Sequence, residues 1–406
     1  MGNERVVITG IGVIAPNGTG RDDFWKALKS GRSGIKEIGL FDASTFPTRI
    51  AGEVKDFQPA DYMDAKKARR MARFSQFAVA STLMALGDAS LQKKDLEKRD
   101  AMILLGVSTS AMDLIESQHK VFLEKGYRHI LPFGIISATP NVGTGEVISA
   151  LGVEAEMLTV ATGCASGLDA LGLGFRQIRG GSKKIVLAGG ADAPITPLIL
   201  GGLCASRIMS VRNSEPEKAS RPFDRMRDGG VLSEGGAVVV MEELLSAVSR
   251  GARIYGEVIG YGEAAGENPG RGFKSAMLKA VYDADISFGS IDYISAHAPS
   301  DVFLDKEETR VIKEIFGKAA YMIPVSSIKS MVGNPFGSAG VLQAVGGLMA
   351  INEGIIPPTV NYEFPDPECD LDYVPNRARH GNIDTVLINS HGFGGANSAL
   401  LIRKYR

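Results

Sequence analysis

Short apolar runs alternate with longer stretches of helical periodicity along the whole chain. The apolar runs predict strands at Arg5–Thr9, Ala101–Gly106, Glu156–Ala161, Lys184–Ala188, Gly236–Met241, Arg253–Tyr261, Tyr293–Ala296, Ile323–Ser326, Asp384–Ser390 and Ser398–Ile402. The longer stretches predict helices at Ala65–Leu91, Gly167–Arg179, Lys306–Phe316 and Ala339–Asn352. Several apolar runs are continuous, which is typical of strands covered on both faces. The alternation therefore predicts α/β layers, with helices outside and between the sheets.

The two halves of the chain share a pattern. Lys184–Pro194 ends an apolar strand in glycines and a small polar residue, and Asp384–Asn397 does the same near the carboxyl end. Each half also has a strand that leads into a helix beginning at a chemically reactive residue. The pattern fits an internal duplication joined near Leu244–Ala252, and it equally fits two α/β halves that share only common features.

Composition narrows the class of protein. The chain has 406 residues, of which 44% are hydrophobic and 22% charged, so a large core is expected and disorder is not. Lys+Arg number 45 against 46 Asp+Glu, which gives no bulk charge for nucleic acid or an anionic membrane. The amino-terminal segment lacks the pattern of a secretory leader, and no apolar run reaches the roughly 20 residues that span a bilayer. We therefore expect a soluble cytoplasmic protein without membrane insertion.

Cys164 has the best context for a nucleophile. In MLTVATGCASGLDALGLGFRQI a buried strand leads through a sharp turn at Cys164 into a helix. A helix amino terminus stabilises a thiolate, so we expect a lowered thiol pKa. The small neighbours would let a substrate carbonyl approach the sulfur. The alternative is a buried, inert thiol. Cys204 and Cys369 lack this context, and the three cysteines show neither disulfide nor metal-site spacing, so no metal is expected.

Other residues are weaker candidates on local pattern alone. His297 ends an apolar strand, on the edge where α/β sites collect, although a lone histidine is more often structural. Asn334 could donate to an oxyanion or simply cap a turn, and His391 lies beside the glycine-rich turn GFGG. The charged segment RPFDRMRDGG is interpreted as a solvated or salt-bridged loop.

Several long motifs together resemble one family. RVVITGIGVIAPNG, KKARRMARFSQFA, VATGCASGLDALG, RPFDRMRDGGVLSEGGAVVVMEE, SSIKSMVGNPFGSAG, PDPECDLDYVPN and NSHGFGGANSALLI follow in family order. The chain resembles a β-ketoacyl-acyl-carrier-protein synthase of the type II condensing-enzyme class, in the thiolase-like superfamily. The resemblance implies a five-layered α-β-α-β-α fold of two similar halves. We expect residues 1–250 to carry the nucleophile and 251–406 to carry His297 and Asn334, in one integrated unit.

The resemblance also implies roles for individual residues. Cys164 would take an acyl chain from acyl carrier protein, and malonyl-carrier protein would lose CO2 and attack it. His297 matches the histidine that assists decarboxylation. Lys329, Asp305 and Glu308 match a charged network beneath the site. Phe393 matches a gating phenylalanine whose amide pairs with that of Cys164 as the oxyanion hole. No cofactor is implied beyond the carrier's phosphopantetheine arm, and the expected partners are acyl carrier protein and a second copy, with a heterodimer possible.

The chain departs from the family at several positions. Asn334 replaces a second histidine, so the triad becomes Cys-His-Asn. The usual Gly-Thr-x-Thr after His297 is Ala298–Asp301, which loses two hydroxyls that hold pantetheine. Three departures concern the acyl pocket: Gly230 replaces a phenylalanine, Thr109 an isoleucine, and His391 a phenylalanine. A glutamate is replaced by Gln343.

The leading hypothesis is a carrier-protein-dependent condensing enzyme of a specialised fatty acid or polyketide pathway. A second is an acyltransferase or thioesterase that uses the same cysteine without elongation. A third is a non-catalytic partner that resembles a chain-length factor, against which the intact Cys164 turn counts.

Overall fold

The computed structural model describes residues 3–406; Met1 and Gly2 of the expected amino-terminal half lie outside it. The main strands are β1 (Val6–Ala15), β5 (Met102–Gly106), β6 (Glu156–Val160), β7 (Ile185–Asp192), β8 (Gly235–Glu243), β9 (Gly256–Ala265), β10 (Tyr293–Ser295), β11 (Val325–Ser326), β14 (Thr385–Gly392) and β15 (Ala396–Arg403). The short strands are β2 (Gly18–Thr19), β3 (Lys36–Glu37), β4 (Ile50–Ala51), β12 (Ile355–Ile356) and β13 (Arg379–His380). Each predicted strand is present, with ends shifted by a few residues.

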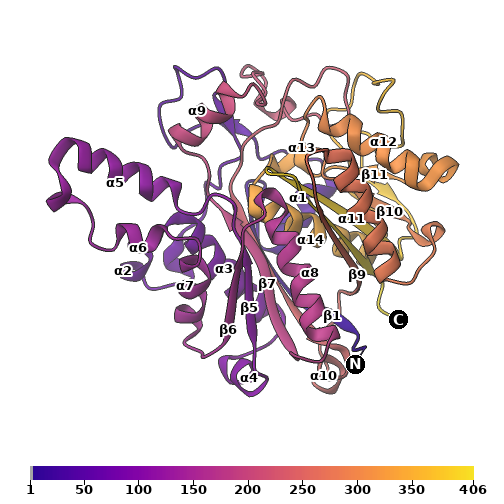
Figure 1. The fold of residues 1–406 in the computed structure, drawn as a ribbon, viewed down its shortest axis with the longest axis horizontal. Coiled ribbons are helices and arrows are strands. Elements are labelled where there is room, and N and C mark those ends of the chain that lie inside the picture. The colour runs from indigo at the N-terminus through magenta and orange to yellow at the C-terminus, as the bar shows by residue number, and fades with distance from the viewer. Residues whose placement is uncertain (1–2) are drawn as a thin grey trace.

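The helices cover and separate the sheets. They are α1 (Arg21–Lys29), α2 (Ala65–Ala68), α3 (Arg73–Asp88), α4 (Lys93–Lys98), α5 (Met112–Lys125), α6 (Gly134–Ala138), α7 (Val142–Leu151), α8 (Ser166–Arg179), α9 (Pro197–Ala205), α10 (Leu244–Ser249), α11 (Pro269–Asp283), α12 (Leu304–Phe316), α13 (Lys329–Val332) and α14 (Ala339–Glu353). Figure 1 shows α8 running between the two groups of strands and α11 and α12 on the carboxyl-terminal side.

The two halves have the same strand order. The amino-terminal half runs β6-β5-β7-β8-β1 and the carboxyl-terminal half runs β11-β10-β14-β15-β9. Counted along the chain, each half follows the order 3-2-4-5-1. A short antiparallel pairing of β1 with β9, from Val6 to Ile8, joins the two halves. The equal order agrees with the expectation of two similar halves.

Five layers follow from the packing. Helix α3 packs against β1 and β8, and α11 packs against β9 and β15. Helices α8 and α14 contact each other and strands of both halves, so they form the middle layer. Their close approach needs glycine: a Cβ on Gly340 of α14 would lie 2.7 Å from the Cβ of Leu168 in α8. The expected α-β-α-β-α arrangement is therefore confirmed.

The helix predicted over Ala65–Leu91 is wrong in one respect, because the structure breaks it in two. Helix α2 begins at an Asp64 cap and ends at Ala68, and α3 starts only at Arg73 after an extended Ala72. The break lets Arg73 reach the buried Glu234 and the carbonyl of Val54. Periodicity along a single segment does not report such a distant partner.

No helix among residues 3–406 is both long and apolar enough to cross a membrane.

Candidate active site

Cys164 lies where the sequence predicts it, between a strand and a helix. Strand β6 ends at Val160, a single 3₁₀ turn spans Gly163–Ala165, and α8 begins at Ser166. Gly163 has a φ of 63°, a conformation that glycine adopts without steric cost. The carbonyl of Cys164 accepts a hydrogen bond from the Ser390 hydroxyl at 3.0 Å, which ties the turn to β14.

The expectation of a lowered thiol pKa is wrong. Burial raises the pKa of the Cys164 thiol to about 11, although the Asn334 amide and the charge of Lys329 act in the opposite direction. The side chain is only 3% exposed. The free energy of removing a thiolate from water is larger here than the stabilisation that the amides of one short turn provide. The thiol is therefore neutral in the substrate-free protein near pH 7.

His297 follows β10 and lines the same cavity as Cys164. Its Nδ1 accepts a hydrogen bond from the backbone amide of His391 at 3.2 Å. A neutral imidazole that accepts at Nδ1 carries its proton at Nε2. Burial, together with the charges of Lys329 and His391, moves the pKa of His297 well below its usual value. His297 is thus a neutral Nε2–H donor at physiological pH.

Asn334 completes the group around the sulfur. Its Nδ2 donates to the Cys164 Sγ at 3.6 Å, and its backbone amide donates to the Val231 carbonyl at 2.7 Å. Its Oδ1 is buried without a hydrogen-bond partner among residues 3–406. The structure thus brings together Cys164, His297 and Asn334 from three separate segments, although 170 positions separate the cysteine from the asparagine.

Lys329 and Glu308 lie directly behind His297. The Lys329 Nζ donates to the His297 carbonyl at 2.6 Å. The Glu308 carboxylate accepts from the amides of His297 and Ala298 at 2.9 and 2.8 Å. Both backbone groups around His297 are therefore held, which fixes the ring relative to the cavity.

Asp305 belongs to a different cluster from Lys329. Its carboxylate accepts from the Phe223 amide at 2.9 Å and lies 3.7 Å from the Arg227 Nε. Burial raises the pKa of Asp305 to about 8, while the Arg227 charge opposes this. Asp305 makes no direct hydrogen bond or ion pair with Lys329 in the described part of the chain, and its charge acts on Lys329 through space.

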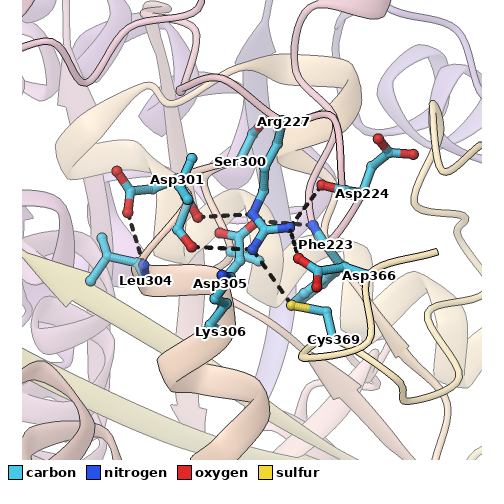
Figure 2. A network of polar contacts seen from close by, with 12 residues as sticks. Phe223, Asp224, Arg227, Ser300, Asp301, Leu304, Asp305, Lys306, Asp366 and Cys369 are labelled. Atoms are coloured by element: carbon cyan, nitrogen blue, oxygen red, sulfur yellow. Dashed lines mark hydrogen bonds and ion pairs between the residues drawn. The ribbon is translucent and has the colours of Figure 1, made fainter. Parts of the chain in front are cut away.

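Arg227 is the centre of that second cluster (Figure 2). Its guanidinium pairs with Asp366 at 2.8 Å and donates to the carbonyls of Asp301 and Val302 at 3.2 and 3.1 Å. The segment RPFDRMRDGG is therefore salt-bridged, as one of the two interpretations held. Arg227 is buried rather than solvated, and it anchors the loop that follows His297.

In the loop Ala298–Asp301, the Ser300 hydroxyl is engaged within the protein and does not face a ligand. Ser300 is fully buried with a φ of 71°, and its hydroxyl accepts from the Arg221 amide at 3.0 Å. The Asp301 carboxylate accepts from the amides of Phe303 and Leu304 at the start of α12. Of these two polar side chains, Asp301 lines the cavity.

One cavity contains the reactive side chains. It has a volume of about 550 Å³, counted with the open space at its mouth. Its lining residues are Cys164, Leu203, Ile208, Met209, Gly230, Val231, Leu232, His297, Pro299, Asp301, Leu304, Asn334, Phe336, His391 and Phe393. Gly230, His391 and Phe393, which the resemblance assigned to the acyl pocket and its gate, line this cavity.

Thr109 does not line this cavity. Its hydroxyl and its amide both donate to the Asp192 carboxylate, at 2.9 and 2.8 Å. Asp192 is fully buried and also accepts from the amides of Ser108 and Gly337. The side chain of Thr109 therefore bonds Asp192 within the protein, and the sequence pattern did not reveal this contact.

The backbones of Cys164 and Phe393 pass each other closely. A Cβ on Gly163 would lie 3.0 Å from the Phe393 nitrogen, and one on Gly392 would lie 3.1 Å from the Cys164 nitrogen. Only glycines allow this approach. The Phe393 side chain is exposed at the cavity mouth and meets Phe336 edge to face.

Two functional neighbours escaped the sequence reasoning. Ser390 holds the Cys164 carbonyl, and Asp192 joins the ends of β5 and β7 to the start of α14. The only signal for Asp192 was a small polar residue at the end of an apolar strand. Gln343 stood out only as a departure from the family pattern.

The fold and site define a ketosynthase of the thiolase-like class. A solved ishigamide ketosynthase/chain length factor matches the structure with a TM-score of 0.95 and 34% identity, covering 100% of both chains. A type II polyketide ketosynthase, solved in complex with its acyl-carrier protein, matches with a TM-score of 0.91 and 32% identity over 99% of this chain and 100% of that one.

Sequence comparison establishes the family. The chain matches the β-ketoacyl synthase N-terminal domain over residues 3–247 and the C-terminal domain over residues 253–363. It is 42% identical to the 3-oxoacyl-[acyl-carrier-protein] synthase 2 of Synechocystis sp., over 99% of each chain. The chain belongs to the β-ketoacyl synthase family of condensing enzymes, as the sequence motifs indicated.

Proposed function

We propose that this protein joins an acyl group on Cys164 to a malonyl unit carried by acyl carrier protein, in a decarboxylative Claisen condensation. The observation that carries the proposal is the grouping of Cys164 with two hydrogen-bond donors, Asn334 and His297, in one cavity. Relatives named 3-oxoacyl-[acyl-carrier-protein] synthase 2 and a carrier-bound polyketide ketosynthase support the substrate class.

The first step is acyl transfer. The Cys164 sulfur attacks the acyl thioester on the carrier, a new carbon–sulfur bond forms, and the carrier leaves with its thiol. The neighbouring amides of Cys164 and Phe393 are suited to stabilise the oxyanion of this step. Because the resting thiol is protonated, its proton passes to the departing phosphopantetheine sulfur as the carbon–sulfur bond of the carrier breaks.

The second step forms the carbon–carbon bond. The malonyl thioester loses CO2 and its electron pair becomes an enolate. The Nε2–H of His297 and the amide of Asn334 donate to the enolate oxygen. The enolate carbon then attacks the acyl carbonyl, and the Cys164 sulfur leaves and regains a proton. Lys329 and Glu308 position His297 through its backbone. No cofactor enters these steps apart from the carrier's phosphopantetheine arm.

The acyl chain is proposed to be bulky or branched, in a specialised fatty acid or polyketide pathway. Gly230 lies on the cavity wall and leaves it without a side chain, so a large residue there would take up acyl space. Gly230→Phe should therefore impair transfer of bulky acyl groups to Cys164 more than transfer of straight ones.

The proposed assembly is a homodimer that works in the cytoplasm, with a heterodimer as the alternative. Strand β6 lies at the end of its sheet and leaves Met157 and Leu158 each 46% exposed. A second copy would cover this apolar edge. Within one chain, we place the boundary of the two halves between residues 250 and 251, after α10 and before β9.

The test is mass spectrometry of the purified protein with acyl- and malonyl-carrier protein. Acyl-carrier protein alone should add one acyl group to Cys164, and malonyl-carrier protein should then give CO2 and a 3-oxoacyl-carrier product. Cys164→Ala should abolish both, whereas the matched control Cys204→Ala should retain both.

Other outcomes select the rival functions. An acylated Cys164 without elongation indicates an acyltransferase, and one that only hydrolyses indicates a thioesterase. If Cys164 takes no acyl group, the proposal is wrong and a chain-length-factor-like role remains.

A further inference from the structure

Gln343 joins the ends of two strands that lead to the site. It lies in α14 and is 1% exposed. Its Nε2 donates to the carbonyls of Ser295, Ala296 and Asn389, at 3.2, 2.8 and 3.1 Å. These carbonyls belong to the ends of β10 and β14, just before His297 and His391. Carbonyls only accept hydrogen bonds, so the nitrogen end of the amide must face them.

This orientation places the other end of the amide at Lys329. The Gln343 Oε1 accepts from the Lys329 Nζ at 3.1 Å, and the second acceptor of Lys329 is the His297 carbonyl at 2.6 Å. Both acceptors are neutral. Within residues 3–406 no carboxylate lies within ion-pair distance of Lys329, because Glu308 is occupied by the amides of His297, Ala298 and Asn389.

We propose that Gln343 is a positioning residue that holds Lys329 on the His297 carbonyl through a neutral oxygen instead of a carboxylate. Gln343 would thus set how strongly the charge of Lys329 acts on Cys164 and His297. The link to catalysis rests on the proposed function, while the effect on Lys329 does not.

The charges around Lys329 agree with this assignment. Burial lowers the pKa of Lys329 to about 8, against the opposing effects of Glu308 and Asp305 from α12 and of Cys164 before α8. His297 and His391, the other titratable groups facing this region, are neutral because burial lowers the pKa of each. The ammonium in turn lowers the pKa of both Cys164 and His297.

The test is a pH titration of the full-length protein with ¹³Cε-labelled lysine, followed by NMR. The resonance that Lys329→Met removes identifies Lys329, and its midpoint should lie near pH 8. Gln343→Glu should raise the midpoint by about one unit or more, since a carboxylate beside an ammonium favours the charged form. Gln343→Met should lower it, because an acceptor is lost.

A raised Lys329 midpoint in Gln343→Glu and a lowered one in Gln343→Met would show a specific effect of this side chain, because a general loss of structure would not shift the midpoint in opposite directions. Asn352→Asp is the matched control: it makes an amide-to-acid change on the same helix, at a side chain that bonds the carbonyls of Tyr255 and Leu348 away from the site. An unchanged midpoint in Gln343→Glu, or an equal shift in Asn352→Asp, overturns the proposal. Gln343→Glu decides alone if the methionine variant does not fold.

The titration uses neither carrier protein nor substrate, so it separates this inference from the proposed condensation. For an active enzyme, the pH profile of CO2 release should move with the Lys329 midpoint in each variant. Shifted midpoints without any CO2 release would contradict the condensation and leave the positioning of Lys329 intact.

Discussion

At the scale of single residues, the site surrounds a buried sulfur that accepts a hydrogen bond from one side chain. Cys164 is neutral at rest because burial raises its pKa to about 11. The Asn334 amide is the side chain that donates to it, at 3.6 Å. An amide always presents an N–H donor and carries no charge, whereas an imidazole at the same position would donate from a nitrogen set by its tautomer and could become charged. The amide therefore suits a buried site in which charge is costly.

Asn334→His is expected to retain or raise CO2 release from malonyl-carrier protein, because both side chains can donate to the same oxygen. Asn334→Leu keeps similar bulk without a donor and should lower release by about 100-fold, the cost of one lost oxyanion donor. The measurement is CO2 release by both variants and wild type. Equal rates in Asn334→Leu and wild type would remove the donor role, and complete loss in Asn334→His would show a site built specifically around the amide.

At the scale of elements, one buried arginine fixes the loop between β10 and α12. Arg227 pairs with Asp366 and donates to the carbonyl of Asp301 (Figure 2). It also donates to the carbonyl of Val302. The loop supplies Pro299 and Asp301 to the cavity wall. Its shape thus depends on contacts from two distant segments of the chain.

Arg227→Met should lower the free energy of unfolding by about 3–5 kcal/mol, because Asp366 would be left as an uncompensated buried charge. Arg379→Met is the matched control, since Arg379 and Asp372 form a largely exposed pair, and it should cost at most about 1 kcal/mol. Urea unfolding of the two variants gives the comparison. Equally small losses in both would mean that the Arg227 cluster contributes little to stability.

At the scale of the whole molecule, an apolar edge remains uncovered. Strand β6 pairs only with β5 in the described chain, and α5 and α6 extend from the body on the same side (Figure 1). Leu123 of α5 and Ile135 and Ile136 of α6 are also well exposed. Exposed apolar side chains on elements at one side of a molecule are typical of a surface that another chain covers.

Leu158→Asp should convert the proposed dimer into monomers, because a buried unpaired carboxylate opposes association. Sedimentation velocity of wild type and variant measures this directly. Tyr282→Asp, at an exposed residue of α11 in the other half, should leave the dimer unchanged. A monomeric wild type would contradict the homodimer, and association only with a related chain would indicate a heterodimer.

The sequence by itself determined the layers and the position of Cys164 between a strand and a helix. Strands such as Ile185–Asp192 and the turn at Cys164 follow from local apolar patterns and from glycines, which adopt backbone conformations that other residues avoid. Long motifs around Cys164, Lys329 and Phe393 indicated the family, because these motifs are continuous along the chain. Only the tertiary structure decided the break before Arg73, the separation of Asp305 from Lys329, the commitment of Thr109 to Asp192 and the sign of the pKa change at Cys164. Each of these depends on burial and on partners far away along the chain, which local spacing does not encode.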